Sequence, residues 1–399
     1  MHAVDDVQAF PEGSRVLHIG PPKTGTTVVQ SALHSSRAAM AEYSVEYAAS
    51  KRHPRAAAAA VSFDKVPAGY RSDIRSQWDN LAHDFRSSTA SRVILSSETL
   101  SNASDEQAAG IVKDLGGGEN LKVVLTLRPL AALLSSRWQQ FVQDFMVMPY
   151  PKWLEKVFAE GAEDRLGTDR FWRRYRLDEH IRRWGSLVGE ENLTFIVLDP
   201  TDRDMLLHTF DRLLGMPEGT LVADRADRNL SLPYPEVEMI RRFNKRFIAE
   251  GNSRSYYVRS VRMHSLPQMK RVDAVTEQKY PIETPAWAVA RSNELSERMN
   301  EAIRASDAMV IGDLDRLIQT NPAPDAPQAL PETMSVESAA ELAYAMFVGA
   351  QNYIPLPDDE RDEGSPARPP APKPTLESFS GAELVHELRR RAARKVRRG

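Results

Sequence analysis

A glycine-containing turn between an apolar segment and a helix-forming segment carries the residues best suited to chemistry. The sequence RVLHIGPPKTGTTVVQSAL, residues 15–33, predicts a strand over 15–19, a turn, and a helix that begins near Thr26. Backbone N–H groups and the positive end of the helix dipole meet at such a turn, which therefore favours an anion. Gly25 permits close approach of the backbone, and the hydroxyls of Thr26 and Thr27 can donate hydrogen bonds to the same anion.

The lysine of this turn is not where a nucleoside-triphosphate loop has it. That loop follows G-x-x-x-x-G-K-[ST], with the lysine directly after the second glycine. Gly20 and Gly25 keep the spacing, but Lys23 precedes the second glycine by two residues. At the rim of the turn, a lysine suits the bridging oxygen of a leaving group, where negative charge grows in the transition state.

A second candidate anion site lies in LTLRPLAALLSSRWQQF, residues 125–141. Arg128 ends a predicted strand, and Ser136 follows eight residues later inside the next predicted helix. The forked donors of a guanidinium, together with a hydroxyl, suit a phosphate monoester. Ser135 competes with Ser136 for this role.

Together the two motifs resemble those of the sulfotransferase family, whose members use adenosine 3′-phosphate 5′-phosphosulfate (PAPS) as donor. PKTGTT is similar to the family's 5′-phosphosulfate-binding loop, and Arg128 and Ser136 match its 3′-phosphate-binding element in type and spacing. The order of later segments, through about residue 320, resembles certain bacterial sulfotransferase-like proteins. The sequence departs from the family at Pro129, which follows Arg128 directly where most members have Arg-Asp-Pro or Arg-Asn-Pro.

The resemblance implies a reaction and a set of binding residues. A sulfo group would move in line from PAPS to an acceptor hydroxyl, leaving adenosine 3′,5′-bisphosphate (PAP). No metal is implied, because the transferred group is singly charged, unlike the phosphoryl group that recruits a divalent cation. The acceptor stays open between a glycan, a glycolipid and a small natural product. We expect its contacts in residues 235–320, with Tyr256, Tyr257 and the arginines of that region, which favour a polar or anionic acceptor. The nucleotide would be held by Lys23, Thr24, Gly25, Thr26, Thr27, Arg128 and Ser136, with Arg225, Arg228 and Asn229 as candidates for a closing basic loop.

Glu98 is the candidate general base. It follows the apolar run VIL in SSETL, at the carboxyl end of a predicted strand, where ligands bind in doubly wound sheets. Some carbohydrate-modifying sulfotransferases use a glutamate base, whereas cytosolic small-molecule members use a histidine. The alternatives are an exposed or helix-initiating carboxylate at Glu98, or a base at His264. His18 lies inside the first strand and is expected to be a packed core histidine.

Short apolar segments that alternate with helical ones predict the elements that position these residues. Further strands are expected near 44–48, 91–97, 120–128 and 192–200, and residues 235–320 are expected to be mostly helical. The alternation indicates an α/β fold, a parallel sheet flanked by helices of the P-loop-like sulfotransferase type. We expect a sulfotransferase domain over 12–320 and an extension over 321–399.

The extension contains a Pro-rich linker, a helix with Ser335 as N-cap, an acidic Pro-rich segment expected to be disordered, and a basic amphipathic helix. The last eleven residues carry seven positive charges, so the rest of the chain is near −10 within a net charge of −3. Three interpretations of this basic tail stay open: a solvated helix, peripheral attachment to anionic lipid, and contact with an acidic protein surface.

Composition excludes several classes of protein. The 399 residues include no cysteine, which excludes disulfides, thiolate metal sites and a cysteine nucleophile. The negative body argues against a nucleic-acid partner. No apolar run approaches the roughly 18 residues of a membrane span, and the first residues do not resemble a signal peptide, so we expect a cytoplasmic protein. The sequence does not indicate an oligomeric state.

Two alternative functions remain at this stage. A P-loop-type kinase would need the lysine that is missing after Gly25, and also a carboxylate pair for magnesium. A non-catalytic scaffold with the sulfotransferase fold would bind the nucleotide without turning it over.

Overall fold

The computed structural model describes residues 7–65, 74–118, 120–165, 170–223, 231–267, 269 and 280–351. Arg225, Arg228 and Asn229, together with the acidic segment and basic tail of the extension, lie outside the described residues. Within the described residues, no helix is both long enough and apolar enough to cross a membrane.

Six strands form one all-parallel sheet in the order β2-β3-β1-β4-β5-β6. The predicted α/β fold and its first five strands are confirmed. The sixth, in a region predicted to be mostly helical, was not predicted. The strand bounds are β1 Arg15–Gly20, β2 Val45–Tyr47, β3 Arg92–Ser96, β4 Leu121–Leu127, β5 Leu193–Val197 and β6 Met309–Ile311.

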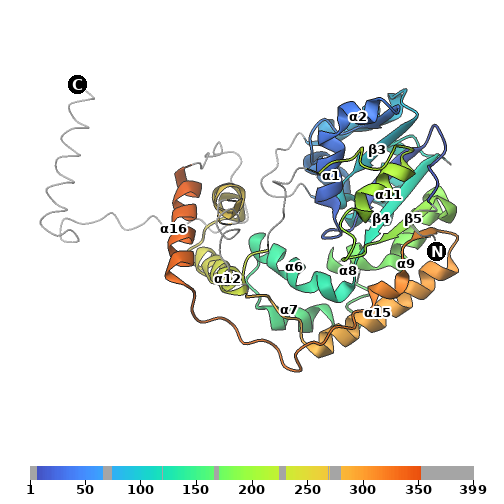
Figure 1. Cartoon of the computed structure of the whole chain (residues 1–399). Coiled ribbons are helices and arrows are strands. Elements are labelled where there is room, and N and C mark those ends of the chain that lie inside the picture. Colours follow the sequence, from blue (N-terminus) through green and yellow to red (C-terminus); the bar gives the residue numbers. More distant parts are fainter. Residues whose placement is uncertain are drawn as a thin grey trace, which may run out of the picture.

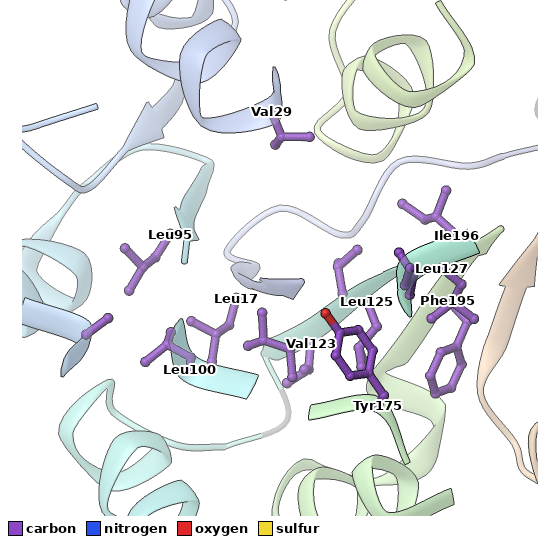
Figure 2. Close-up of a cluster of buried hydrophobic side chains, with 14 of the residues drawn as sticks. Leu17, Val29, Leu95, Leu100, Val123, Leu125, Leu127, Tyr175, Phe195 and Ile196 are labelled. Atoms are coloured by element: carbon purple, nitrogen blue, oxygen red, sulfur yellow. The ribbon is translucent and has the colours of Figure 1, made fainter. Parts of the chain in front are cut away.

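The central strands are apolar on both faces because helices cover both faces of the sheet. All five residues of β5 are buried, and β4 is buried at every position except Lys122. Figure 2 shows side chains of β1, β3, β4 and β5 gathered with Val29 of the first helix and with Tyr175. Such continuous apolar runs are typical of parallel strands in α/β proteins.

Helical segments connect the strands and build a second layer beyond the sheet. The α4 sequence places Ile74, Trp78, Leu81, Ala82 and Phe85 at helical spacing on one buried face. The bounds are α1 Thr26–Ser35, α2 Arg37–Ala41, α3 Arg55–Ser62, α4 Ile74–Ser87, η2 Glu98–Asn102, α5 Asp105–Asp114, α6 Leu130–Gln143, α7 Tyr150–Val157, α8 Arg170–Tyr175, α9 Leu177–His180, η3 Ile181–Gly185, α10 Ser186–Val188, η4 Glu190–Asn192, α11 Met205–Leu213, α12 Tyr234–Ala249, α13 Arg254–Tyr257, η6 Val258–Ser265, α15 Ala286–Ala305, η7 Leu314–Leu317 and α16 Val336–Gln351.

A helical layer extends away from the sheet past α6 (Figure 1). Helix α12 packs on α6, and α16 packs on the π-helical segment η6. A methyl group added at Gly349 of α16 would lie 2.6 Å from the carbonyl oxygen of Ser260, so this contact is close. The predicted helix after the Pro-rich linker is confirmed as α16, and the Ser335 hydroxyl accepts from the backbone N–H of Ser338.

Strand order places the motifs at one edge. Strands β3 and β4 flank β1, so the segments that follow these three strands meet at their carboxyl ends. Chain connections leave β1 and β4 in opposite directions, which makes this edge a topological switch point, the usual position of ligands in such sheets. The loop with Lys23 follows β1, Glu98 follows β3, and Arg128 follows β4.

Candidate functional site

The backbone of the turn after β1 requires a glycine at position 25. Gly25 is the N-cap of α1 and has a φ of 88°. A methyl group added there would lie 2.5 Å from Leu206 Cδ2. Lys23 also has positive φ, at 72°, in a region that non-glycine residues seldom adopt. Backbone strain of this kind is concentrated at binding and catalytic sites.

Buried hydroxyls tie the turn to the sheet. The Thr24 hydroxyl donates to the carbonyl oxygen of Pro21 at 2.6 Å and lies 2.7 Å from the Thr126 hydroxyl of β4. Thr126 in turn lies 3.3 Å from Nε2 of His18. Thr24 is fully buried, so its hydroxyl belongs to the interior, and a ligand at the turn would meet the Thr24 backbone instead. Thr26 is buried as well, and Thr27 is half-buried at the start of α1.

His18 is a core histidine, as the sequence predicted. It is fully buried, and its Nδ1 is hydrogen-bonded to the Ser96 hydroxyl at 2.8 Å. Burial lowers the pKa of His18 to about 3, and the negative charge of Glu98 only partly opposes this. The imidazole is therefore neutral at physiological pH, and its hydrogen bonds to Ser96 and Thr126 support the turn.

Glu98 lies directly against the start of the turn. A methyl group added at Gly20 would lie 3.0 Å from Glu98 Cβ and 3.1 Å from its Cα, so the missing side chain of Gly20 makes room for Glu98. The Tyr175 hydroxyl of α8 donates to the carbonyl oxygen of Pro22 at 2.9 Å and fixes the turn from the other side. The predicted position of Glu98 just past the carboxyl end of a strand is confirmed, because β3 ends at Ser96.

The Glu98 carboxylate is ionised and oriented. Gln30 Nε2 of α1 donates to Glu98 Oε2 at 2.8 Å, and Gln30 Oε1 is hydrogen-bonded to His53 Nδ1. Burial acts to raise the pKa of Glu98, but the positive charge of Arg55 and the hydrogen bond from Gln30 outweigh it, and the pKa is lowered. Glu98 is therefore a carboxylate at neutral pH, the form that a general base requires. It is also the first residue of η2, the alternative role weighed from sequence.

Arg128 contacts the turn after β1. Arg128 Nη1 donates to the carbonyl oxygen of Lys23 at 3.3 Å, which brings the end of β4 into contact with the turn after β1. Arg128 is exposed, and Ser136 is half-buried two turns into α6.

A cavity of about 430 Å³ opens beside Glu98, and sequence reasoning did not identify it as a unit. Pro22 of the turn and Glu98 line it, so it adjoins both the proposed leaving-group site and the proposed base. Five arginines also line it: Arg55, Arg137, Arg174, Arg254 and Arg262. We call this cavity the arginine cleft.

The region 235–320 was expected to supply acceptor contacts. It contributes Arg254 and Arg262 to the arginine cleft, but Tyr257 is fully buried and packs on Phe145. Tyr256, Tyr257 and His264 do not line the arginine cleft.

Sequence and structure comparisons give only distant similarities. No protein-family model and no curated protein matches the sequence. A sulfotransferase structure from Alicyclobacillus acidocaldarius is similar at 15% identity and a TM-score of 0.37, over 61% of this chain and 95% of that one. The signal recognition particle 54 kDa protein from Aeropyrum pernix K1, in complex with GDP, gives 14% identity and a TM-score of 0.25, over 87% and 75% of the two chains. These values assign no family to the chain, so its function is inferred from the geometry of the site.

Proposed function

We propose that this chain is a PAPS-dependent sulfotransferase that acts on a hydroxyl group. The observation that carries the proposal is the meeting of three motifs at the carboxyl ends of adjacent strands. A turn with Lys23 at its rim follows β1, Arg128 reaches that turn from β4, and the ionised Glu98 packs against it from β3. This arrangement suits a donor with separate 5′ and 3′ anionic groups and an acceptor placed beside a base.

Each group has a defined role in the proposed reaction. The backbone N–H groups of the turn and the hydroxyls of Thr26 and Thr27 would bind the 5′ phosphosulfate. Arg128 and Ser136 would bind the 3′-phosphate, and we retain Arg228, outside the described residues, as a further contact. The proposed catalytic domain spans residues 12–320, with 321–399 as an appended segment.

Proton and charge movements balance within the proposed site. The acceptor oxygen bonds to sulfur as the bond between sulfur and the bridging phosphate oxygen breaks. Glu98 would accept the acceptor's hydroxyl proton, and the Lys23 ammonium would stabilise negative charge on the departing oxygen. The tether of Glu98 to Gln30 fixes the carboxylate before the acceptor arrives, which lowers the entropic barrier to reaction.

Calorimetric titration tests this function. Wild type should bind PAP without magnesium, and Arg128→Ala should weaken binding by about ten- to 150-fold, the value of hydrogen bonds to a charged group. Arg246→Ala is a matched control, because the Arg246 side chain is 80% exposed and forms an ion pair with Glu250 at the end of α12. Silence toward PAP with clear binding of ATP and magnesium would refute the proposal in favour of a kinase. PAP binding without sulfo transfer from PAPS to any acceptor would favour the scaffold.

A further inference from the structure

Arg137 of α6 is a buried cation. It is only 2% exposed, and its Nη1 donates to Gln140 Oε1 at 2.5 Å. Its guanidinium lies 4.6 Å from the ring centre of Phe141, and its Nε has no hydrogen-bond partner. In the part of the chain that the structure describes, no carboxylate forms an ion pair with it. Because buried charges are normally paired, this arginine lacks an anion.

The cleft that Arg137 lines is strongly positive. Five arginines line it against two carboxylates, Glu98 and Asp144. Asp144 is already engaged, because its Oδ1 accepts from Arg262 Nε at 2.7 Å. Its backbone carbonyl oxygen accepts from Arg254 Nη2 at 3.5 Å. Arginines therefore outnumber carboxylates along the wall of the arginine cleft, and a guanidinium fork is suited to two oxygens of a carboxylate, sulfate or phosphate.

A second, larger cavity adjoins the arginine cleft. This neighbour has a volume of about 660 Å³ and shares Arg55 and Arg262 with the arginine cleft. Its wall is mixed, with His53 and Asp84 beside Leu81 and Met263. A ligand longer than one sugar ring could extend from the arginine cleft, past these two arginines, into the second cavity.

We propose that the acceptor is an anionic hydroxyl compound whose carboxylate, sulfate or phosphate binds Arg137 in the arginine cleft, which leaves its hydroxyl beside Glu98. This inference rests on the proposed sulfotransferase function and adds the chemical class of the acceptor. A neutral acceptor would leave Arg137 buried and unpaired in the complex, so the cleft discriminates against it.

Titration of the PAP-loaded protein tests the inference, because saturating PAP fills the phosphate sites of the turn. The probes are glucuronate, glucose 6-phosphate, glucose 6-sulfate, inorganic phosphate and inorganic sulfate, with glucose as the neutral counterpart. At least one anion should bind at least tenfold more tightly than glucose. Arg137→Gln should weaken that binding by about ten- to 100-fold and leave PAP affinity within a few-fold.

Two further variants guard against a folding artefact. Arg254→Gln removes an exposed arginine of the same cleft and should weaken anion binding severalfold. Arg259→Gln, whose side chain donates to Ser255 and does not line the arginine cleft, should have no effect. The inference is overturned if no anion binds better than glucose, or if Arg137→Gln and Arg254→Gln bind the anions as wild type does. Failure of wild type to bind PAP at all would instead refute the sulfotransferase function, and the acceptor assignment with it.

Discussion

Replacing Thr126 with valine should loosen the proposed phosphate-binding turn, although the substitution changes only contacts between fully buried side chains. The Thr126 hydroxyl lies 2.7 Å from that of Thr24 and 3.3 Å from His18 Nε2, and all three residues are fully buried. Valine keeps the shape but removes both contacts. Thr24 retains its bond to the Pro21 carbonyl oxygen, whereas His18 Nε2 is left without that partner.

The expected loss follows from the burial of these groups. A buried polar group deprived of its partner costs about 1–3 kcal/mol, so Thr126→Val should lower the free energy of unfolding by that amount. Each 1.4 kcal/mol of this loss that acts on the geometry of the turn weakens PAP binding tenfold. We therefore expect PAP affinity to fall by about three- to 30-fold, since part of the loss acts on the folded core alone.

The assay compares urea denaturation and PAP calorimetry in Thr126→Val and a matched control. Ser292→Ala removes a similarly buried hydroxyl that donates to the carbonyl oxygen of Ala288 at 2.7 Å within α15. The control should lose stability but keep its PAP affinity. Equal PAP affinity in wild type and Thr126→Val, despite a measurable loss of stability, would refute the idea that this hydroxyl network holds the turn in its binding geometry.

Three further outcomes are expected. Burial lowers the pKa of His18 and of His180 to about 3. Between about pH 6.5 and pH 3, each histidine therefore binds a proton in the unfolded chain but not in the folded one. Stability should drop by about 2 kcal/mol per histidine between pH 7.5 and pH 5. In urea denaturation His180→Gln should remove one histidine's share of that drop, and an identical drop in wild type and variant would contradict the assignment. Gly25→Ala should lower the free energy of unfolding by about 1–3 kcal/mol, because residue 25 has a φ of 88° and the new methyl group meets Leu206. In denaturation the same substitution should cost less in a Leu206→Ala background than in wild type, and an equal cost in both backgrounds would disprove the clash. Glu98→Gln should slow single-turnover sulfo transfer from PAPS about 100- to 10,000-fold with little change in PAP affinity, and an unchanged rate would exclude Glu98 as the base.

Local patterns were sufficient to predict the parts of the fold and site that depend on neighbouring residues. The strand, turn and helix around Lys23 form a continuous pattern, and the apolar run before Glu98 predicts a buried strand end. Strand order then brings Glu98 and Arg128 to the same edge as the turn. The sixth strand, Met309–Ile311, was missed because three residues are too few to show an alternating pattern within a helical region.

Long-range contacts account for what the sequence did not predict. The inward position of the Thr24 hydroxyl depends on Thr126, 102 residues away, and no local pattern indicates it. Arg137 did carry a signal. It lies four residues after Leu133 and four before Phe141, on the buried side of α6, and a charged residue at such a position suggests a buried ligand contact. That Arg137 lines a cleft beside Glu98 required the full fold.

The proposed function requires that the β1–β4 edge binds a nucleotide through a separate 3′-phosphate site. The direct measurement is the affinity of the metal-free protein for PAP beside adenosine 5′-monophosphate, which lacks that phosphate. We predict that PAP binds at least tenfold more tightly in wild type and that the difference largely disappears in Arg128→Ala. Equal affinity for the two nucleotides in wild type would contradict the claim.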